Sequence, residues 1–146
     1  MTVEHPFNKI VEGIGVSDIR QFDAEVSSIP GIIKLTLGEP NFDTPEHIKE
    51  AAIQAIKDNH SHYTPNSGIP ELRQAAAEYY NKKFNFNYTA DQVITTIGAT
   101  EGINASLQAI LNPGDTVIAP TPVFPLYLPI TLVNQGNFIT VDTSED

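Results

Sequence analysis

The pattern of apolar and polar positions is most informative in residues 91–111. Residues 93–97 read Val-Ile-Thr-Thr-Ile, and such β-branched runs are typical of strands. Gly98 then ends the apolar run. From Ile103 onwards, apolar side chains recur at Leu107, Ile110 and Leu111, which is the spacing of one face of a helix. The stretch therefore predicts a strand, a glycine turn and a helix.

A strand that turns through small residues into a helix leaves N–H groups at the positive end of the helix dipole, where anions bind. Gly98-Ala99-Thr100 fits this description, and the hydroxyl of Thr100 can add a donor. Phosphate is the commonest ligand of such turns. An ordinary strand-to-helix turn without a ligand is the alternative, and this stretch alone favours it.

The rest of the chain shows the same kinds of pattern. Thr44 is a good helix N-cap, Pro45 is a good first helical residue, and Pro70 opens another helix. The apolar face of the helix after Pro45 comprises Ile48, Ala52, Ala55 and Ile56, which we expect to be buried. The predicted elements are helices at 18–28, 45–59, 70–84 and 123–134 and strands at 32–37, 116–119 and 137–141.

Residues 91–141 thus read as strand, helix, strand, helix, strand with short connections. This βαβαβ order predicts an α/β fold with a parallel sheet, right-handed crossovers and helices on the faces of the sheet. Ligands of such sheets bind at the carboxyl ends of the strands. Residues 98–100 and 120–124 both follow predicted strands, so we expect them to face one shared site.

Composition narrows the class of partner. The chain has 146 residues, enough for one domain, and a net charge of −10 from 18 acidic and 8 basic residues. An acidic chain without basic clusters argues against nucleic acids and anionic membranes. No apolar run is long enough to span a bilayer, residues 1–6 lack a signal pattern, and we expect a cytoplasmic protein. The chain has no cysteine, and His60 and His62 are better explained as surface loop residues than as metal ligands.

Several separated motifs, in their order and spacing, resemble the pyridoxal-phosphate-dependent class I/II aminotransferases of fold type I. The look is closest to bacterial aromatic amino acid and N-acetyl-diaminopimelate aminotransferases. The motifs are Gly38-Glu39-Pro40-Asn41-Phe42-Asp43-Thr44-Pro45, residues 63–73 from Tyr63 to Arg73, residues 96–102, Leu111-Asn112-Pro113-Gly114-Asp115 and Pro122-Val123-Phe124. The resemblance implies an N-terminal arm and small-domain segment in residues 1–44. It implies the first part of the large cofactor-binding domain in residues 45–146.

The resemblance assigns cofactor-binding roles to the predicted anion turn. It implies that the N–H groups of Ala99 and Thr100, with the Thr100 hydroxyl, hold the phosphate of pyridoxal 5'-phosphate. Glu101 complicates this assignment, because a carboxylate repels a phosphate, so its side chain must point away from the ligand. Phe124 matches the aromatic residue that stacks on the cofactor ring. Its alternative is a phenylalanine of the apolar core.

Three further positions carry roles that only the resemblance implies. Tyr63 matches a tyrosine that reaches the phosphate bound by the neighbouring subunit of a dimer, and its alternative is an exposed loop tyrosine. Gly38 matches the glycine whose backbone lies against the substrate carboxylate. Its alternative is a turn glycine with positive φ. The bond between Thr121 and Pro122 is expected to be cis, as the family tends to have there.

The groups that would perform the chemistry are missing. Transamination needs a lysine that bonds covalently to the cofactor, a carboxylate for the ring nitrogen and an arginine for the substrate carboxylate. No lysine follows a predicted strand end near Thr100 and Phe124, and neither Arg20 nor Arg73 is well placed. In the family these groups lie later in a sequence more than twice as long. We therefore expect an N-terminal part that is inactive by itself and has exposed apolar surfaces, which favour a homodimer or higher oligomer.

Two other readings stay open. The same motifs suit a pyridoxal-phosphate-dependent carbon–sulfur lyase or synthase, and they also suit a non-catalytic phosphate-binding or dimerisation fragment. The aminotransferase reading implies an amino acid and a 2-oxo acid as substrates. The amino acid cannot be identified, although Phe42, Tyr63 and Tyr127 can line a pocket for an aromatic side chain.

Overall fold

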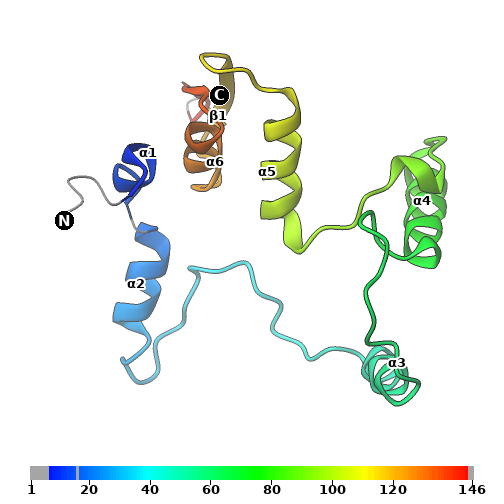
Figure 1. Cartoon of the computed structure of the whole chain (residues 1–146). Helices are drawn as coiled ribbons and strands as arrows, with labels where there is room; N and C mark the ends of the chain where they lie inside the picture. Colours follow the sequence, from blue (N-terminus) through cyan, green and yellow to red (C-terminus); the bar gives the residue numbers. More distant parts are fainter. Residues whose placement is uncertain (1–6, 16, 145–146) are drawn as a thin grey trace, which may run out of the picture. The chain divides into compact units, whose positions relative to one another are not determined.

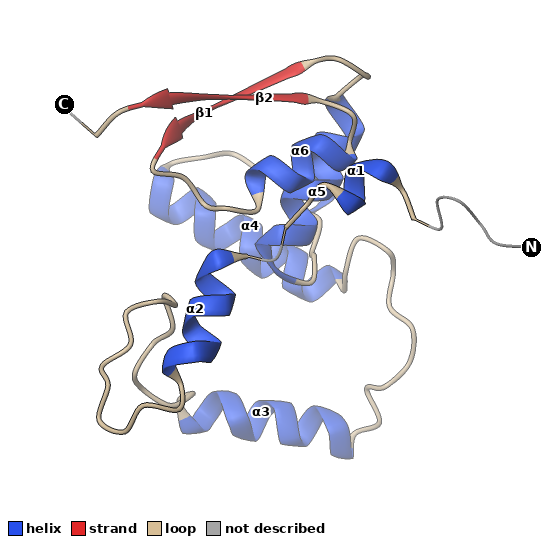
Figure 2. Cartoon of the chain, turned by 90° about the vertical axis from the view of Figure 1, so that its left-hand side faces the viewer, coloured by secondary structure: helices blue, strands red, loops and turns tan. Residues whose placement is uncertain are grey.

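The computed structural model describes residues 7–15 and 17–144 and shows an α/β chain (Figures 1 and 2). The parts of the predictions that concern residues 1–6, 16, 145 and 146 lie outside the described residues. The elements in chain order are α1 (Lys9–Glu12), α2 (Asp18–Val26), α3 (Glu46–Lys57), α4 (Pro70–Phe84), a 3₁₀ turn (Ala90–Gln92), α5 (Gly98–Ile110), β1 (Thr116–Thr121), α6 (Tyr127–Val133) and β2 (Asn137–Asp142).

The chain divides into two compact units. Residues 1–37 and 97–146 make up the first unit, and residues 38–96 make up the second. This division describes which residues pack together. It does not test the domain boundary predicted at residue 44, which stays a prediction.

The first unit is built around a β–α–β crossover. β1 and β2 pair in parallel, from Thr116 opposite Asn137 to Thr121 opposite Asp142, and α6 connects them. Helix α6 packs against α1, α5 and β2, and Figure 2 shows α5 and α6 on the same side of the two strands. The α/β class and the predicted parallel pairing are therefore confirmed.

The small core of this unit lies between α6 and its neighbours. Ala119 of β1 and Ile130 of α6 are buried, and Thr131 is fully buried. The Thr131 hydroxyl donates a hydrogen bond of 2.8 Å to the carbonyl oxygen of Tyr127, one helical turn back. This bond satisfies a hydroxyl that would otherwise be buried at a cost in free energy.

Proline sets the start of α6. The sequence predicts a helix from residue 123, whereas α6 begins at Tyr127, beyond Pro125. Pro129 is the third residue of α6, where a backbone N–H has no acceptor within the helix, so a residue that lacks this N–H is tolerated there.

The strands predicted at 32–37 and 93–97 are not formed in the described structure. A strand needs a neighbouring strand for its backbone hydrogen bonds, and β1 and β2 pair only with each other. Residue Thr95 instead bonds a loop, through its N–H to the carbonyl oxygen of Ser67 at 3.0 Å. The predicted βαβαβ order is thus present as βαβ, with α5 preceding it.

The second unit contains α3, α4 and the 3₁₀ turn, and its two helices confirm the predictions for 45–59 and 70–84. Arg73 of α4 fixes the segment that follows the 3₁₀ turn. Its Nε donates to the carbonyl oxygen of Val93 at 2.9 Å, and its guanidinium lies 3.2 Å from a carboxylate oxygen of Asp91. The Asn81 side chain adds two hydrogen bonds of 2.8 Å to the backbone of Tyr88.

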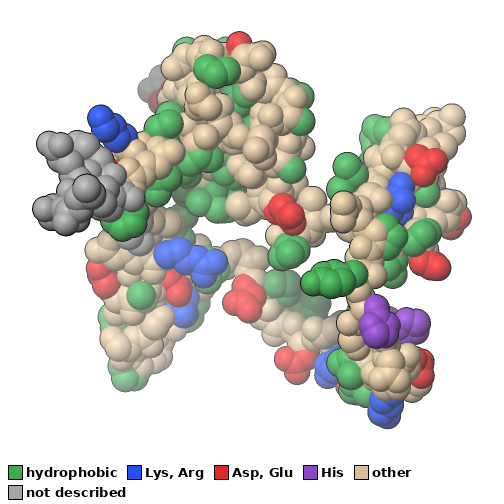
Figure 3. Space-filling model, in the orientation of Figure 1, with side chains coloured by type: hydrophobic (Ala, Val, Ile, Leu, Met, Phe, Trp, Pro, Cys, Tyr) green, Lys and Arg blue, Asp and Glu red, His purple; other side chains and the backbone are tan. Residues whose placement is uncertain are grey.

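Much of the apolar surface of the described residues is uncovered (Figure 3). The predicted burial of the α3 face is wrong, because Ile48, Ala52 and Ile56 are exposed and Ala55 is only half-buried. Aromatic rings at the end of α4 and just beyond it contact one another in sequence but stay about half exposed; they are Tyr79, Tyr80, Phe84, Phe86 and Tyr88. Among the described helices, none is long and apolar enough to cross a membrane.

Candidate active site

The predicted anion turn forms the first turn of α5. Gly98 is the first helical residue and has φ of +79°, a conformation that glycine adopts without a steric penalty. Ala99 and Thr100 follow it, and both are exposed. The N–H groups of a first helical turn have no acceptor within the helix. The turn therefore presents the N–H groups of Ala99 and Thr100 and the Thr100 hydroxyl at the positive end of a 13-residue helix.

The side chain of Glu101 folds back over this turn. Its carboxylate accepts a hydrogen bond from the N–H of Ile97, the N-cap residue of α5. Isoleucine has no side-chain acceptor, so Glu101 supplies the contact that a capping residue normally makes. The sequence predicted only that Glu101 complements the helix N-terminus. An acidic residue in the first helical turn was the signal for this bond, but the partner could not be read from the sequence.

The second part of the site follows β1. The bond between Thr121 and Pro122 is cis, which confirms the prediction. The carbonyl oxygen of Thr121 accepts hydrogen bonds from the N–H and the hydroxyl of Thr143, at 3.1 and 2.9 Å. Sequence reasoning missed Thr143, because its role depends on the pairing of β1 with β2. These bonds hold the loop that carries Phe124.

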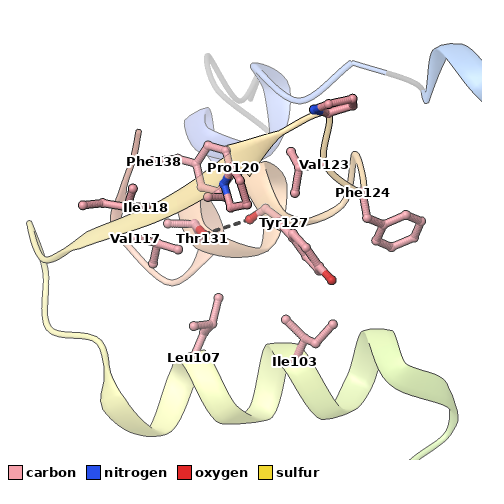
Figure 4. Close-up of a pocket in the computed structure, with 12 residues that line it drawn as sticks. Ile103, Leu107, Val117, Ile118, Pro120, Val123, Phe124, Tyr127, Thr131 and Phe138 are labelled. Atoms are coloured by element: carbon pink, nitrogen blue, oxygen red, sulfur yellow. Dashed lines mark hydrogen bonds between the residues drawn. The ribbon is translucent and has the colours of Figure 1, made fainter. Parts of the chain in front are cut away.

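Phe124 is not a core residue. Its side chain is 49% exposed, and its ring contacts Tyr127 edge to face, with ring centres 5.7 Å apart. Figure 4 shows Phe124 projecting beyond Ile103, away from the Leu107 side of the cavity. The partial exposure leaves a face of the ring available for stacking.

A cavity of about 540 Å³ lies between α5 and the β1–α6 region (Figure 4). Its walls are mainly apolar, as expected for a site that takes a flat ring. The lining residues are Ile103, Leu107, Val117, Ile118, Ala119, Pro120, Pro122, Val123, Phe124, Tyr127, Thr131 and Phe138. Tyr127, one of the residues suggested to line a pocket, does so. All of these residues belong to the first unit.

The directions of α5 and β1 place the two parts of the site at one end of the cavity. In Figure 4, Leu107 lies on the side of Val117, and Ile103 lies on the side of Phe124. Helix α5 therefore runs opposite to β1. Its N-terminal turn, with Ala99 and Thr100, is at the end of the cavity where β1 finishes and Phe124 begins. This matches the shared site expected from the sequence, although α5 is not preceded by the predicted strand.

The two remaining predicted site residues belong to the second unit. Tyr63 is fully exposed, at 108% of its reference area. Gly38 has no atom within 4 Å of the position a β-carbon would take, and its φ lies outside the left-handed region. The alternative reading of Gly38 as a turn glycine with positive φ is therefore wrong. The substrate and cofactor roles of Gly38 and Tyr63 stay predictions.

The cations of the described residues are largely engaged elsewhere. Arg73 binds Val93 and Asp91, Lys49 lies 3.0 Å from Glu46, and Lys34 lies 3.4 Å from Asp23. No lysine or arginine is among the residues that line the cavity. Within the described ranges, no group of three or more histidine and acidic side chains could hold a metal ion. His60 and His62 are exposed, in keeping with surface loop residues.

Some carboxylates of the first unit are stabilised in their charged form. The hydroxyl of Ser144, followed by its N–H, lowers the pKa of Asp142 at the end of β2. The N–H of Asn112 and then its side chain lower the pKa of Asp115. Both hydrogen bonds favour the ionised carboxylate.

Comparison with known proteins gives one consistent family. Residues 30–146 match the family described as Aminotransferase class I and II. The chain is 44% identical over 143 residues to a probable N-acetyl-LL-diaminopimelate aminotransferase of Bacillus subtilis, covering 97% of this chain and 36% of that protein. It is 41% identical to an aspartate aminotransferase of Pyrococcus horikoshii, covering 89% of this chain and 33% of that protein.

The fold comparison agrees. The solved structure of aspartate aminotransferase from Thermus thermophilus with maleate matches with a TM-score of 0.90 and 33% identity, over 97% of this chain and 38% of that chain. This chain spans about a third of the length of the curated relatives it matches. The match of a family over 117 consecutive residues and the high identity to its members lead to one conclusion. The chain belongs to the class I and II aminotransferase family and has its fold type I architecture.

Proposed function

We propose that this chain supplies the cofactor phosphate turn and the ring-stacking residue of a pyridoxal-phosphate-dependent aminotransferase. The reaction moves an amino group between an amino acid and a 2-oxo acid. The observation that carries the proposal is the arrangement of Ala99 and Thr100 in the first turn of α5, at the end of an apolar cavity where Phe124 projects.

The residues present fit pyridoxal 5'-phosphate. A phosphate suits the N–H groups of Ala99 and Thr100 and the Thr100 hydroxyl, because helix N-termini favour anions. The half-exposed ring of Phe124 offers a flat apolar platform that orients a pyridine ring. The bound cofactor would supply an electron-accepting ring that acidifies the α-carbon of the amino acid. The chain's own residues bind and orient the cofactor and shield one side of it from water.

Residues 1–146 alone are proposed to be inactive. The cavity lining contains no lysine, and proton transfer at the α-carbon requires a base within hydrogen-bonding reach. Transfer is preferred over the carbon–sulfur lyase alternative, because the relatives reported above are aminotransferases. No observation favours a purely non-catalytic fragment.

Two features extend the proposal to an assembled enzyme. The fully exposed Tyr63 is free to contact a phosphate bound by a second subunit, and Gly38 presents an open backbone to a substrate carboxylate. The exposed apolar faces of α3 and α4 support a homodimer or larger assembly. Light scattering of the purified chain tests self-association, and a monomer at all concentrations would contradict it.

A chimera tests the proposed reaction. This chain replaces the matching 143 residues of the Bacillus subtilis relative, so that the remaining sequence comes from that protein. The chimera is expected to retain pyridoxal phosphate and to convert an amino acid into its 2-oxo acid when a second 2-oxo acid is supplied. Thr100→Ala and Phe124→Ala are expected to weaken cofactor retention, because they remove a phosphate donor and the ring platform.

The product distinguishes the alternatives. A 2-oxo acid formed only when an acceptor is present supports transfer, whereas release of ammonia without an acceptor supports a lyase. A folded chimera that retains no cofactor would contradict the proposal. Circular dichroism of the chimera and of the intact relative provides the folding control.

A further inference from the structure

Glu101 occupies an unusual position for a residue beside a phosphate site. Its carboxylate accepts the N–H of Ile97 and so lies at the N-terminal end of α5, where Ala99 and Thr100 present their own N–H groups. Its side chain is exposed. The end of the helix that is proposed to receive a phosphate thus already carries one negative charge.

This contact has two opposing consequences. The hydrogen bond replaces the cap that Ile97 cannot provide, so it holds the turn from Ile97 to Gly98 in shape. The charge also satisfies part of the positive helix dipole and repels a second anion. A phosphate monoester carries between about 1.5 and 2 negative charges at neutral pH, so the repulsion acts on nearly two charges.

We propose that Glu101 is a positioning residue that holds the phosphate turn in its binding shape and, through its charge, lowers the affinity of that turn for phosphate monoesters. This inference rests on the proposed cofactor site. It distinguishes Glu101 from Ala99 and Thr100, which are proposed to bind the phosphate directly. Glutamine at this position keeps the hydrogen-bond acceptor and removes the charge, whereas alanine removes both.

The expected size of the effect follows from Coulomb's law. Charges roughly 7 Å apart at a solvated surface interact weakly, and removing one of them changes the affinity for a doubly charged ligand by roughly two- to tenfold at low salt. Screening reduces the difference as the ionic strength rises, because the Debye length falls to about 3 Å at 1 M salt.

The test uses the complete chain and two ligands. Pyridoxine 5'-phosphate carries the ring and the phosphate but no aldehyde, so it cannot react with lysines; pyridoxine lacks the phosphate. Titration calorimetry compares the unaltered chain, Glu101→Gln, Glu101→Ala and the control Glu25→Gln. Glu25 is an exposed glutamate of α2 in the same unit, and it accepts a hydrogen bond from Gln21, so its substitution removes the same charge without touching the turn.

We expect Glu101→Gln to bind pyridoxine 5'-phosphate roughly two- to tenfold more tightly than the unaltered chain, with a gain that shrinks in high salt. Pyridoxine affinity is expected to stay unchanged, Glu25→Gln to behave like the unaltered chain, and Glu101→Ala to bind the phosphate more weakly than Glu101→Gln. Equal or weaker phosphate binding by Glu101→Gln, or equal binding by the two Glu101 variants, would overturn the inference while leaving the cofactor site intact. No phosphate-dependent binding by any of the proteins would overturn both the site and the inference.

Discussion

Gly68 lies so close to Thr95 that a β-carbon added to the glycine would fall 1.9 Å from the threonine Oγ1. Gly68 also has φ of +98°, which side-chain-bearing residues rarely adopt. The N–H and hydroxyl of Thr95 both donate to the carbonyl oxygen of Ser67, at 3.0 and 3.2 Å. The loop that follows Tyr63 is therefore tied to the segment after the 3₁₀ turn at a point where only glycine fits.

Substitution of this glycine should destabilise the second unit. Gly68→Ala is expected to lower the free energy of unfolding by about 2–3 kcal/mol, because it adds a clash and a strained φ. Gly38→Ala in the same unit is the matched control, since its β-carbon would meet no atom within 4 Å and its φ is not positive. Urea unfolding followed by circular dichroism measures both, and equal midpoints for the two variants would contradict the prediction.

The two partners of Arg73 should contribute unequally. Arg73 is largely buried, with a side chain 14% exposed, whereas Asp91 is 95% exposed. Arg73→Ala leaves the carbonyl oxygen of Val93 without its donor and is expected to cost about 1–3 kcal/mol of stability. Asp91→Asn removes only a solvated ion pair, at a cost below about 1 kcal/mol. Urea unfolding compares them, and a loss for Asp91→Asn as large as that for Arg73→Ala would argue against this account.

Acid should weaken the contact between Asp23 and Thr36. The Thr36 hydroxyl, more than any other group, lowers the pKa of Asp23, and Lys34 lowers it further. A carboxyl whose pKa is lowered by folding stabilises the folded state above its unfolded pKa, and this stability is lost as pH falls through the folded pKa. Thr36→Val should therefore raise the pKa of Asp23 and destabilise the first unit at neutral pH but not in strong acid.

Carbon-detected NMR titration of the Asp23 carboxyl checks this directly. Asp115 serves as the internal reference, because its pKa is lowered by Asn112 and not by Thr36. An unchanged Asp23 pKa in Thr36→Val, or an equal shift at Asp115, would refute the proposed cause.

Residues 1–146 should give no turnover by themselves. Incubation with pyridoxal phosphate, an amino acid and a 2-oxo acid is expected to yield no more product than cofactor alone, because no lysine lines the cavity. A coupled assay of the new 2-oxo acid measures the rate, with the Bacillus subtilis relative as the positive control. A rate well above that of free cofactor would disprove the claim.

The helices and the β1–α6–β2 crossover could be predicted from the sequence, because their patterns are local. Pro70 starts α4 and the apolar spacing after Ile103 defines α5, whatever surrounds them. The runs at 32–37 and 93–97 have the composition of strands but no neighbouring strand in the described structure, and pairing is a property that a single run cannot reveal. Burial of the α3 face failed for the same reason, since burial depends on what packs against a helix.

The site was predictable to a similar extent. The anion turn at Gly98 follows from local chemistry, whereas the placement of Phe124 relied on the family resemblance, because an isolated phenylalanine is more often a core residue. The bond from Ile97 to Glu101 and the support of Thr121 by Thr143 depend on folded geometry. Neither could be read from residue types and spacing.

The central claim is that the first turn of α5 binds the cofactor phosphate beside Phe124, and an NMR titration of the ¹⁵N-labelled chain tests it most directly. Pyridoxine 5'-phosphate is expected to shift the amide signals of Ala99 and Thr100 and the ring signals of Phe124, and Thr100→Ala should reduce these shifts. Pyridoxine should leave the two amide signals in place. Shifts of Ala99 and Thr100 that are absent, or that pyridoxine reproduces without its phosphate, would contradict the account.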